Sequence, residues 1–167
     1  MKQLFLIRHA KAEPEHEDLP DLQRNLTVRG RQDAALIGSV LVGKHPVSPL
    51  ILTSQAQRAM ATTRIIAAIW DAPQDTIQVE PKIYQAGPND LMSLLWHIDN
   101  GFFVVTIVGH NPGLESLIHL LAGKDALDHL PTGASVHLTI EVNRWRDVKA
   151  GSAKVVAIER PKDYRPE

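Results

Sequence analysis

Residues 4–9 read Leu-Phe-Leu-Ile-Arg-His, so that four apolar residues are followed at once by an arginine and a histidine. An apolar run without polar alternation is typical of a strand that is covered on both faces, as in a parallel sheet between two helical layers. The runs Pro49–Leu52 and Phe102–Val108 have the same character. The sequence therefore predicts three buried strands.

Helices are predicted between these strands, because the apolar residues there recur at helical spacing. Thr27, Ser54 and Asn111 are expected to cap three of them, and Gly123 is expected to follow the end of the helix that starts after Asn111. Alternation of buried strands with amphipathic helices predicts an α/β fold of three layers, α/β/α, with a mostly parallel central sheet.

The C-terminal part of the chain has a different pattern. Residues 136–142 alternate between apolar and polar side chains, and a second short apolar run covers residues 154–159. We expect these two segments to form an antiparallel strand pair across the turn-rich segment 143–152. Residues 1–160 are expected to form a single domain, and the charged, proline-containing residues 161–167 a frayed tail.

Composition excludes several classes of function. The 18 Lys and Arg residues balance 19 Asp and Glu residues, so the chain lacks the basic field that nucleic-acid binding requires. The absence of cysteine excludes disulfides, thiolate metal sites and a thiol nucleophile. Apolar runs are too short for a membrane helix, and the N-terminus is unlike a signal peptide. We therefore expect a cytoplasmic protein with no nucleic-acid or membrane partner.

Cationic and titratable side chains follow all three predicted strands. Arg8 and His9 follow the first, Ser54 and then Arg58 follow the second, and His110 follows the third. Ligands of open α/β sheets bind at the carboxyl ends of the strands. Two arginines and two histidines are tolerable together only when an anion binds among them.

Phosphate fits this cluster best, although a carboxylate ligand would also be held. The guanidinium groups of Arg8 and Arg58 match phosphate oxygens, and the helix starts expected at Ser54 and Asn111 would add backbone N–H groups. Imidazole titrates near neutrality and can attack phosphorus or donate a proton, which favours phosphoryl transfer over simple binding.

Several segments are similar to one known family. Residues 6–10, LIRHA, resemble the RHG signature of the histidine phosphatase (phosphoglycerate mutase-like) superfamily, with Ala10 where many members have glycine. Residues 54–62 resemble its S-x-A-x-R-A-x-x-T segment, and residues 109–112, GHNP, its second histidine motif. Together with DLQRNLTVRG at 21–30 and PTGA at 131–134, they make the chain similar to the SixA-type phosphohistidine phosphatase branch.

The resemblance implies that His9 is phosphorylated during turnover, that Arg8 and Arg58 bind the phosphoryl oxygens, and that His110 completes the pocket. Fixed cations of this kind stabilise the transferred group without a metal, so no cofactor or metal is expected. The acidic cluster at residues 15–18 lies on a loop that would not preorganise metal ligands. The implied partner is a phosphohistidine-bearing signalling or carrier protein, with inorganic phosphate as the product.

One departure concerns the acid that protonates an alkoxide leaving group in related phosphatases. Lys82 stands where we align that acid, with Glu80 and Asp90 as the nearby alternatives. An imidazole leaving group needs less help than an alkoxide, which favours phosphohistidine as the substrate. Two other functions stay open: a phosphatase for small phosphomonoesters, and a phosphate or phosphoprotein binding module without turnover.

Overall fold

The computed structural model describes residues 1–45 and 48–166. Six strands form one sheet in the order β3-β2-β4-β1-β5-β6. The strands β1, β2, β3 and β4 are all parallel to one another. Strand β5 is antiparallel to β1, and β6 is antiparallel to β5. The strand bounds are Lys2–Arg8 (β1), Leu50–Thr53 (β2), Ile77–Val79 (β3), Val104–Gly109 (β4), Ser135–Ile140 (β5) and Ala153–Glu159 (β6).

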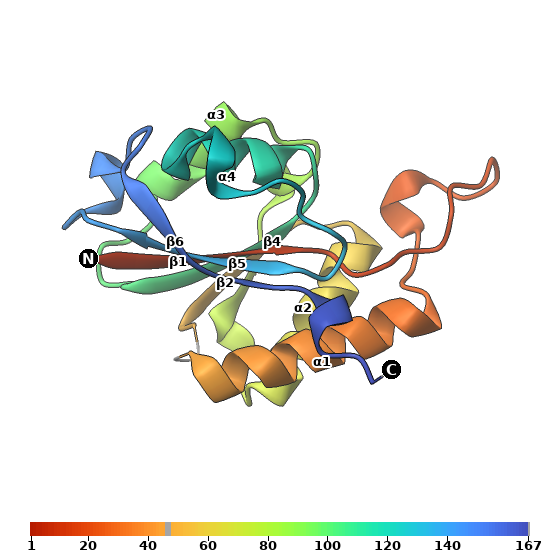
Figure 1. The fold of residues 1–167 in the computed structure, drawn as a ribbon. Helices are drawn as coiled ribbons and strands as arrows, with labels where there is room; N and C mark the ends of the chain where they lie inside the picture. Colours follow the sequence, from red (N-terminus) through yellow and green to blue (C-terminus); the bar gives the residue numbers. More distant parts are fainter. Residues whose placement is uncertain (46–47, 167) are drawn as a thin grey trace.

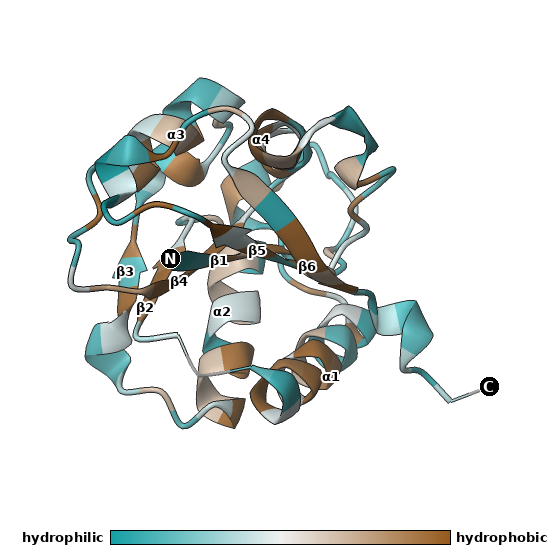
Figure 2. Cartoon of the chain, turned by 60° about the vertical axis from the view of Figure 1, so that its left-hand side comes forward, coloured by the Kyte–Doolittle hydropathy of each residue, from teal (hydrophilic) through white to brown (hydrophobic). Residues whose placement is uncertain are grey.

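Helices cover both faces of this sheet (Figure 1). One layer consists of α1 and α2, and the other of α3 and α4; their bounds are Val28–Lys44, Gln57–Ile69, Pro88–Trp96 and Gly113–Ala122. In β1, Leu4 and Leu6 belong to the core that includes α3 and α4, whereas Phe5 and Ile7 belong to the core that includes α1 and α2. The central strands are accordingly coloured hydrophobic in Figure 2.

This architecture confirms the predicted α/β fold, the three buried strands and the antiparallel pair near the C-terminus. Burial of both faces of β1 explains its unbroken apolar run, since each such side chain contributes about 1.5–3 kcal/mol when removed from water. Strand β3 was not predicted. It has only three residues and lies at the sheet edge, where Gln78 and Val79 are exposed, so it lacks the apolar run of a buried strand.

Two of the predicted helix caps are wrong. Thr27 does cap α1, because its side chain accepts a hydrogen bond from the Gly30 N–H. Helix α2, however, starts after Ala56, and Ser54 Oγ accepts from the Ala56 N–H outside the helix, at 3.1 Å. Helix α4 starts after Pro112, while the Asn111 side chain turns away to a backbone carbonyl.

Gly123 ends α4 as expected, with a φ of 101° that favours glycine.

Residues 161–165 contact α1, where a frayed tail over residues 161–167 was expected; residue 167 lies outside the described residues. Pro161–Asp163 form a short 3-10 helix, and Pro161 is buried. Arg165 Nε donates to Asp33 Oδ1 at 3.0 Å. Asp33 is buried on α1, and a buried carboxylate requires a cationic partner, which explains why the tail is held there.

In the described residues no helix is long and apolar enough to cross a membrane.

Candidate active site

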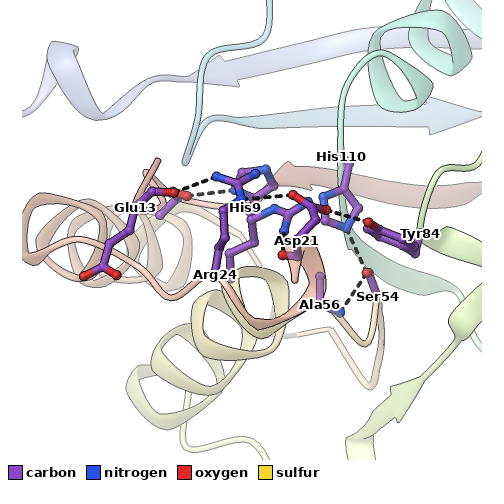
Figure 3. A network of polar contacts seen from close by, with 10 residues as sticks. His9, Glu13, Asp21, Arg24, Ser54, Ala56, Tyr84 and His110 are labelled. Atoms are coloured by element: carbon purple, nitrogen blue, oxygen red, sulfur yellow. Dashed lines mark hydrogen bonds and ion pairs between the residues drawn. The ribbon is translucent and has the colours of Figure 1, made fainter. Parts of the chain in front are cut away.

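The strand order places the predicted site residues at one edge of the sheet. Strands β2, β4 and β1 are adjacent, and Arg8 is paired with Gly109 at their carboxyl ends. The chain then leaves these strands through His9, Ser54 and His110. The His9 and His110 ring centroids are 5.1 Å apart (Figure 3). The structure therefore brings both histidines to the same place.

His9 is held as a neutral imidazole with a defined free nitrogen. Its Nδ1 lies 2.8 Å from the carbonyl oxygen of Ala10. A carbonyl can only accept, so Nδ1 carries the proton and Nε2 bears the free lone pair. Burial lowers the pKa of His9 to about 3, assisted by the charges of His110, Arg58 and Arg8. Burial has a larger effect on this pKa than the neighbouring charges.

In each of the two arginines, Nη groups of the guanidinium are hydrogen-bonded, whereas the Nε group has no partner among the described residues. Arg8 Nη1 donates to the Leu130 carbonyl at 3.1 Å. Arg58 Nη1 donates to the Asp21 carbonyl at 2.8 Å, and its Nη2 to Asp21 Oδ2 at 3.0 Å. Both Nε atoms are buried and have no hydrogen-bond partner in the described part of the chain. Both N–H groups therefore have unused hydrogen-bonding capacity.

His110 is oriented by Ser54. Its Nε2 lies 2.8 Å from Ser54 Oγ, which also accepts from the Ala56 N–H. Ser54 is fully buried, and among its described contacts His110 Nε2 is the acceptor that remains for the hydroxyl hydrogen. The proton of the His110 ring is then on Nδ1, which is buried and unpartnered among the described residues. Burial, followed by the charge of Arg58, lowers the pKa of His110 to about 4.

Ser54 and Asn111 were both predicted to bind substrate. Ser54 contacts the His110 ring and does not line the cavity described below. The Asn111 amide donates to the same Leu130 carbonyl as Arg8, at 2.9 Å. Asn111 still lines the cavity beside His110, and its Oδ1 is buried without a partner among the described residues. Of this pair, only Asn111 lines the cavity.

A cavity of about 380 Å³ opens beside His110. Arg8 and His9 do not line it, but the His9 ring packs against the His110 ring that does. Its lining consists of Asp21, Arg58, Tyr84, Gln85, Ala86, Gly87, His110, Asn111, Pro112 and Gly113. The hollow is large enough for a ring that carries a phosphoryl group.

Asp21 and Tyr84 are site residues that the sequence pattern did not predict. Asp21 accepts from Tyr84 Oη at 2.5 Å, from Arg58 Nη2 at 3.0 Å and from Arg24 Nε at 2.9 Å. Figure 3 shows it between Arg24 and Tyr84. The Tyr84 hydroxyl and the two guanidinium groups hold the pKa of Asp21 well below its usual range, and Asp21 raises the pKa of Tyr84. The position of Asp21 in the stretch DLQRNLTVRG was the one available signal.

The residues weighed as a general acid lie outside the cavity lining. Glu80 accepts a hydrogen bond from the Lys82 N–H at 3.2 Å, and Asp90 from the Gly87 N–H at 2.9 Å. Lys82 and Asp90 line a neighbouring hollow instead. Both carboxylates are thus bonded to nearby backbone groups. In the described residues, no group of three or more histidines and carboxylates is arranged to hold a metal ion.

Comparison with known proteins agrees with the motifs. The family model of the histidine phosphatase superfamily (branch 1) matches residues 4–83. An uncharacterized protein of Mycobacterium tuberculosis is 29% identical over 166 residues, covering 93% of this chain and all of that protein. Residues 4–83, slightly less than half of the chain, are therefore similar to the histidine phosphatase superfamily.

Solved structures are similar to this chain in fold. The protein assigned as SixA in Nakamurella multipartitia has a TM-score of 0.84 at 23% identity, covering 96% of each chain. The protein histidine phosphatase SixA complexed with tungstate has a TM-score of 0.83 at 21% identity, covering 98% of this chain and 99% of that one. The fold is that of the SixA-type proteins.

Proposed function

We propose that this protein removes the phosphoryl group from phosphohistidine on another protein, and that His9 is phosphorylated during turnover. The observation that supports this most directly is a neutral His9 ring with a free Nε2, near buried N–H donors that have no partner in the described part of the chain. These donors are Arg8 Nε, Arg58 Nε and His110 Nδ1. A buried donor without an acceptor is costly, and the oxygens of a phosphoryl group would satisfy such donors.

Transfer to His9 begins with attack of the Nε2 lone pair on phosphorus. The new P–N bond forms while the bond to the substrate ring breaks, and its electron pair stays on the leaving nitrogen. Arg8 and Arg58 stabilise the charge on the equatorial oxygens, and His110 donates from Nδ1. These side chains supply the stabilisation, so the proposal includes no metal or cofactor.

Hydrolysis of phosphorylated His9 follows by attack of water. The oxygen–phosphorus bond forms, the P–N bond breaks, and the electron pair returns to Nε2. Nδ1 keeps its proton, which is hydrogen-bonded to the Ala10 carbonyl. The ring therefore leaves as neutral imidazole and not as an anion. A water proton passes to solvent, and inorganic phosphate is the product.

The test is a trapping experiment with a phosphocarrier protein that bears radiolabelled phosphohistidine. The reaction is stopped in alkaline detergent, because a P–N bond on histidine survives alkali but not acid. We expect label on the wild-type chain and on a His97→Ala control, whose histidine is exposed at the end of α3. We expect none on His9→Ala. Phosphoprotein binding without label on His9 and without phosphate release would instead indicate a binding module.

A further inference from the structure

Asp21 is a carboxylate held at the cavity from several directions. Arg24 contacts it from its own loop, Arg58 from α2, and Tyr84 from the turn before α3. His110, from the end of β4, is the fourth titratable group whose charge interacts with it. Asp21 lines the same cavity as Arg58 and His110, and one third of its side chain is exposed.

The bonds to Asp21 determine what it can do toward a ligand. Two of them, from Arg58 and Tyr84, go to Oδ2, whereas among the described residues Oδ1 accepts from Arg24 alone. A carboxylate oxygen can accept about two hydrogen bonds, so Oδ1 has capacity left. All three partners stabilise the anion, and Asp21 is therefore an acceptor in this cavity and not a proton donor.

We propose that Asp21 is a specificity-determining residue that accepts a hydrogen bond from the second ring nitrogen of the substrate's phosphohistidine. This inference rests on the proposed function and extends it, because it assigns the choice of substrate class to one side chain. Asp21 would keep that second nitrogen protonated at a pH where the ring would otherwise lose the proton.

The proton changes the leaving group. When the P–N bond breaks, its electron pair goes to the nitrogen that carried phosphorus, and the proton remains on the second nitrogen beside Asp21. The ring then departs as neutral imidazole. Without that proton it would depart as an imidazolate anion, which is a much poorer leaving group. The proton comes from solvent before the step, so no further reactant is needed.

The same carboxylate disfavours esters of phosphate. An alkoxide must receive a proton as it leaves. Asp21 has none to give, and the hydroxyl hydrogen of Tyr84 is already donated to Asp21. Negative charge in the cavity also repels an anionic leaving oxygen. The arrangement therefore favours an imidazole leaving group, whose second nitrogen is protonated, over an alkoxide leaving group.

The first test compares two substrates in Asp21→Asn. Cleavage of phosphohistidine needs the protonated second nitrogen. The leaving group of 4-nitrophenyl phosphate is a stable phenolate that needs no proton. We expect kcat/KM for phosphohistidine to fall about ten- to a hundredfold, the worth of one hydrogen bond to a charged group, with a much smaller change for the ester. Asp18→Asn, on the same loop with a 93% exposed side chain, is the matched control and should match wild type.

The second test uses Tyr84→Phe, which leaves the Asp21 carboxylate in place. Loss of the Tyr84 hydroxyl should raise the pKa of Asp21. At the acid end of the pH profile the ratio of kcat/KM for phosphohistidine to that for 4-nitrophenyl phosphate should therefore fall below the wild-type ratio. The ratio is used because protonation of His9 and His110 affects both substrates alike. A role for Asp21 in shape alone would predict no such fall in the ratio.

The possible outcomes distinguish the role of Asp21 from the proposed function on which it rests. Equal losses on both substrates in Asp21→Asn, with an unchanged substrate ratio at acid pH in Tyr84→Phe, would overturn the role of Asp21 while leaving a wild-type enzyme that labels His9. A wild-type enzyme that does not hydrolyse phosphohistidine would overturn the proposed function, and with it this inference. Selective loss together with a lowered substrate ratio at acid pH supports both.

Discussion

The His9–His110 pair and the His45–His137 pair are alike in several respects. Their ring centroids are 5.1 and 4.7 Å apart, respectively. In all four rings burial is the leading cause of a lowered pKa. By these criteria alone, either pair would qualify as a candidate centre.

Their surroundings are different. The His137 ring stacks on Phe5 at 4.3 Å, and its Nε2 contacts Gln3 Oε1 at 2.9 Å. The charged groups that influence His45 are Lys44 and Glu159, which are bonded to each other. Beside His9 and His110, by contrast, lie two arginines whose Nε groups have no partner within residues 1–45 and 48–166. A buried histidine with a shifted pKa is therefore weak evidence of a site, and unpartnered cationic donors around it are the stronger signal.

Substitution of His9 should have the largest effect. We expect His9→Ala to lose roughly a thousandfold or more in kcat, because the nucleophile is removed. Circular dichroism should show an intact fold. Near-wild-type turnover in His9→Ala would contradict the assignment and remove the distinction between the two pairs.

Arg58→Lys tests whether the arginines make the difference. Lysine keeps the charge but loses the planar fork and the Nε donor, so kcat/KM should fall by about 10²–10³, and inhibition by inorganic phosphate should weaken. Arg64→Lys is the control, because Arg64 is exposed on the same helix. Equal behaviour of the two variants would mean that the Arg58 fork is not used.

The sequence was sufficient for the part of the site that follows directly from strands. Arg8, His9 and His110 lie at strand ends, and Arg58 lies in the first turn of the following helix, so sheet order alone brings them together. Asp21 and Tyr84 could not be assigned in this way. Asp21 belongs to the long excursion after β1 (Figure 1), and both reach the site through side chains whose directions depend on loop paths.

Tertiary contacts also decided the features that were predicted wrongly. Ser54 and Asn111 are good caps by residue type, but each bonds a group that sequence proximity does not reveal: Ser54 bonds the His110 ring, and Asn111 the Leu130 carbonyl. The tail is ordered for the same reason, since buried Asp33 binds Arg165. Long-range partners of single polar groups are the information that a local pattern lacks.

Ser54→Ala sharpens the comparison with a smaller effect. It removes the donor to His110 Nε2, so the ring can take its proton on that nitrogen and stop donating from Nδ1. We expect kcat to fall about tenfold with little change in KM, the size of one buried hydrogen bond. Ser54→Cys keeps a weaker donor and should lie between alanine and wild type. A loss confined to KM would contradict the role in orienting His110.

His137→Phe should have the smallest effect on activity and a defined effect on stability. The pKa of His137 is lowered from 6.5 to about 4, so between these values the unfolded chain binds more protons than the folded one. The free energy of unfolding is therefore largest above pH 6.5 and falls as the pH falls toward 4. His9 and His110 contribute in the same direction, so the variant should keep a fall that is shallower than that of wild type. Urea unfolding at several pH values measures both slopes, and equal slopes would mean that His137 titrates alike in the folded and unfolded chains.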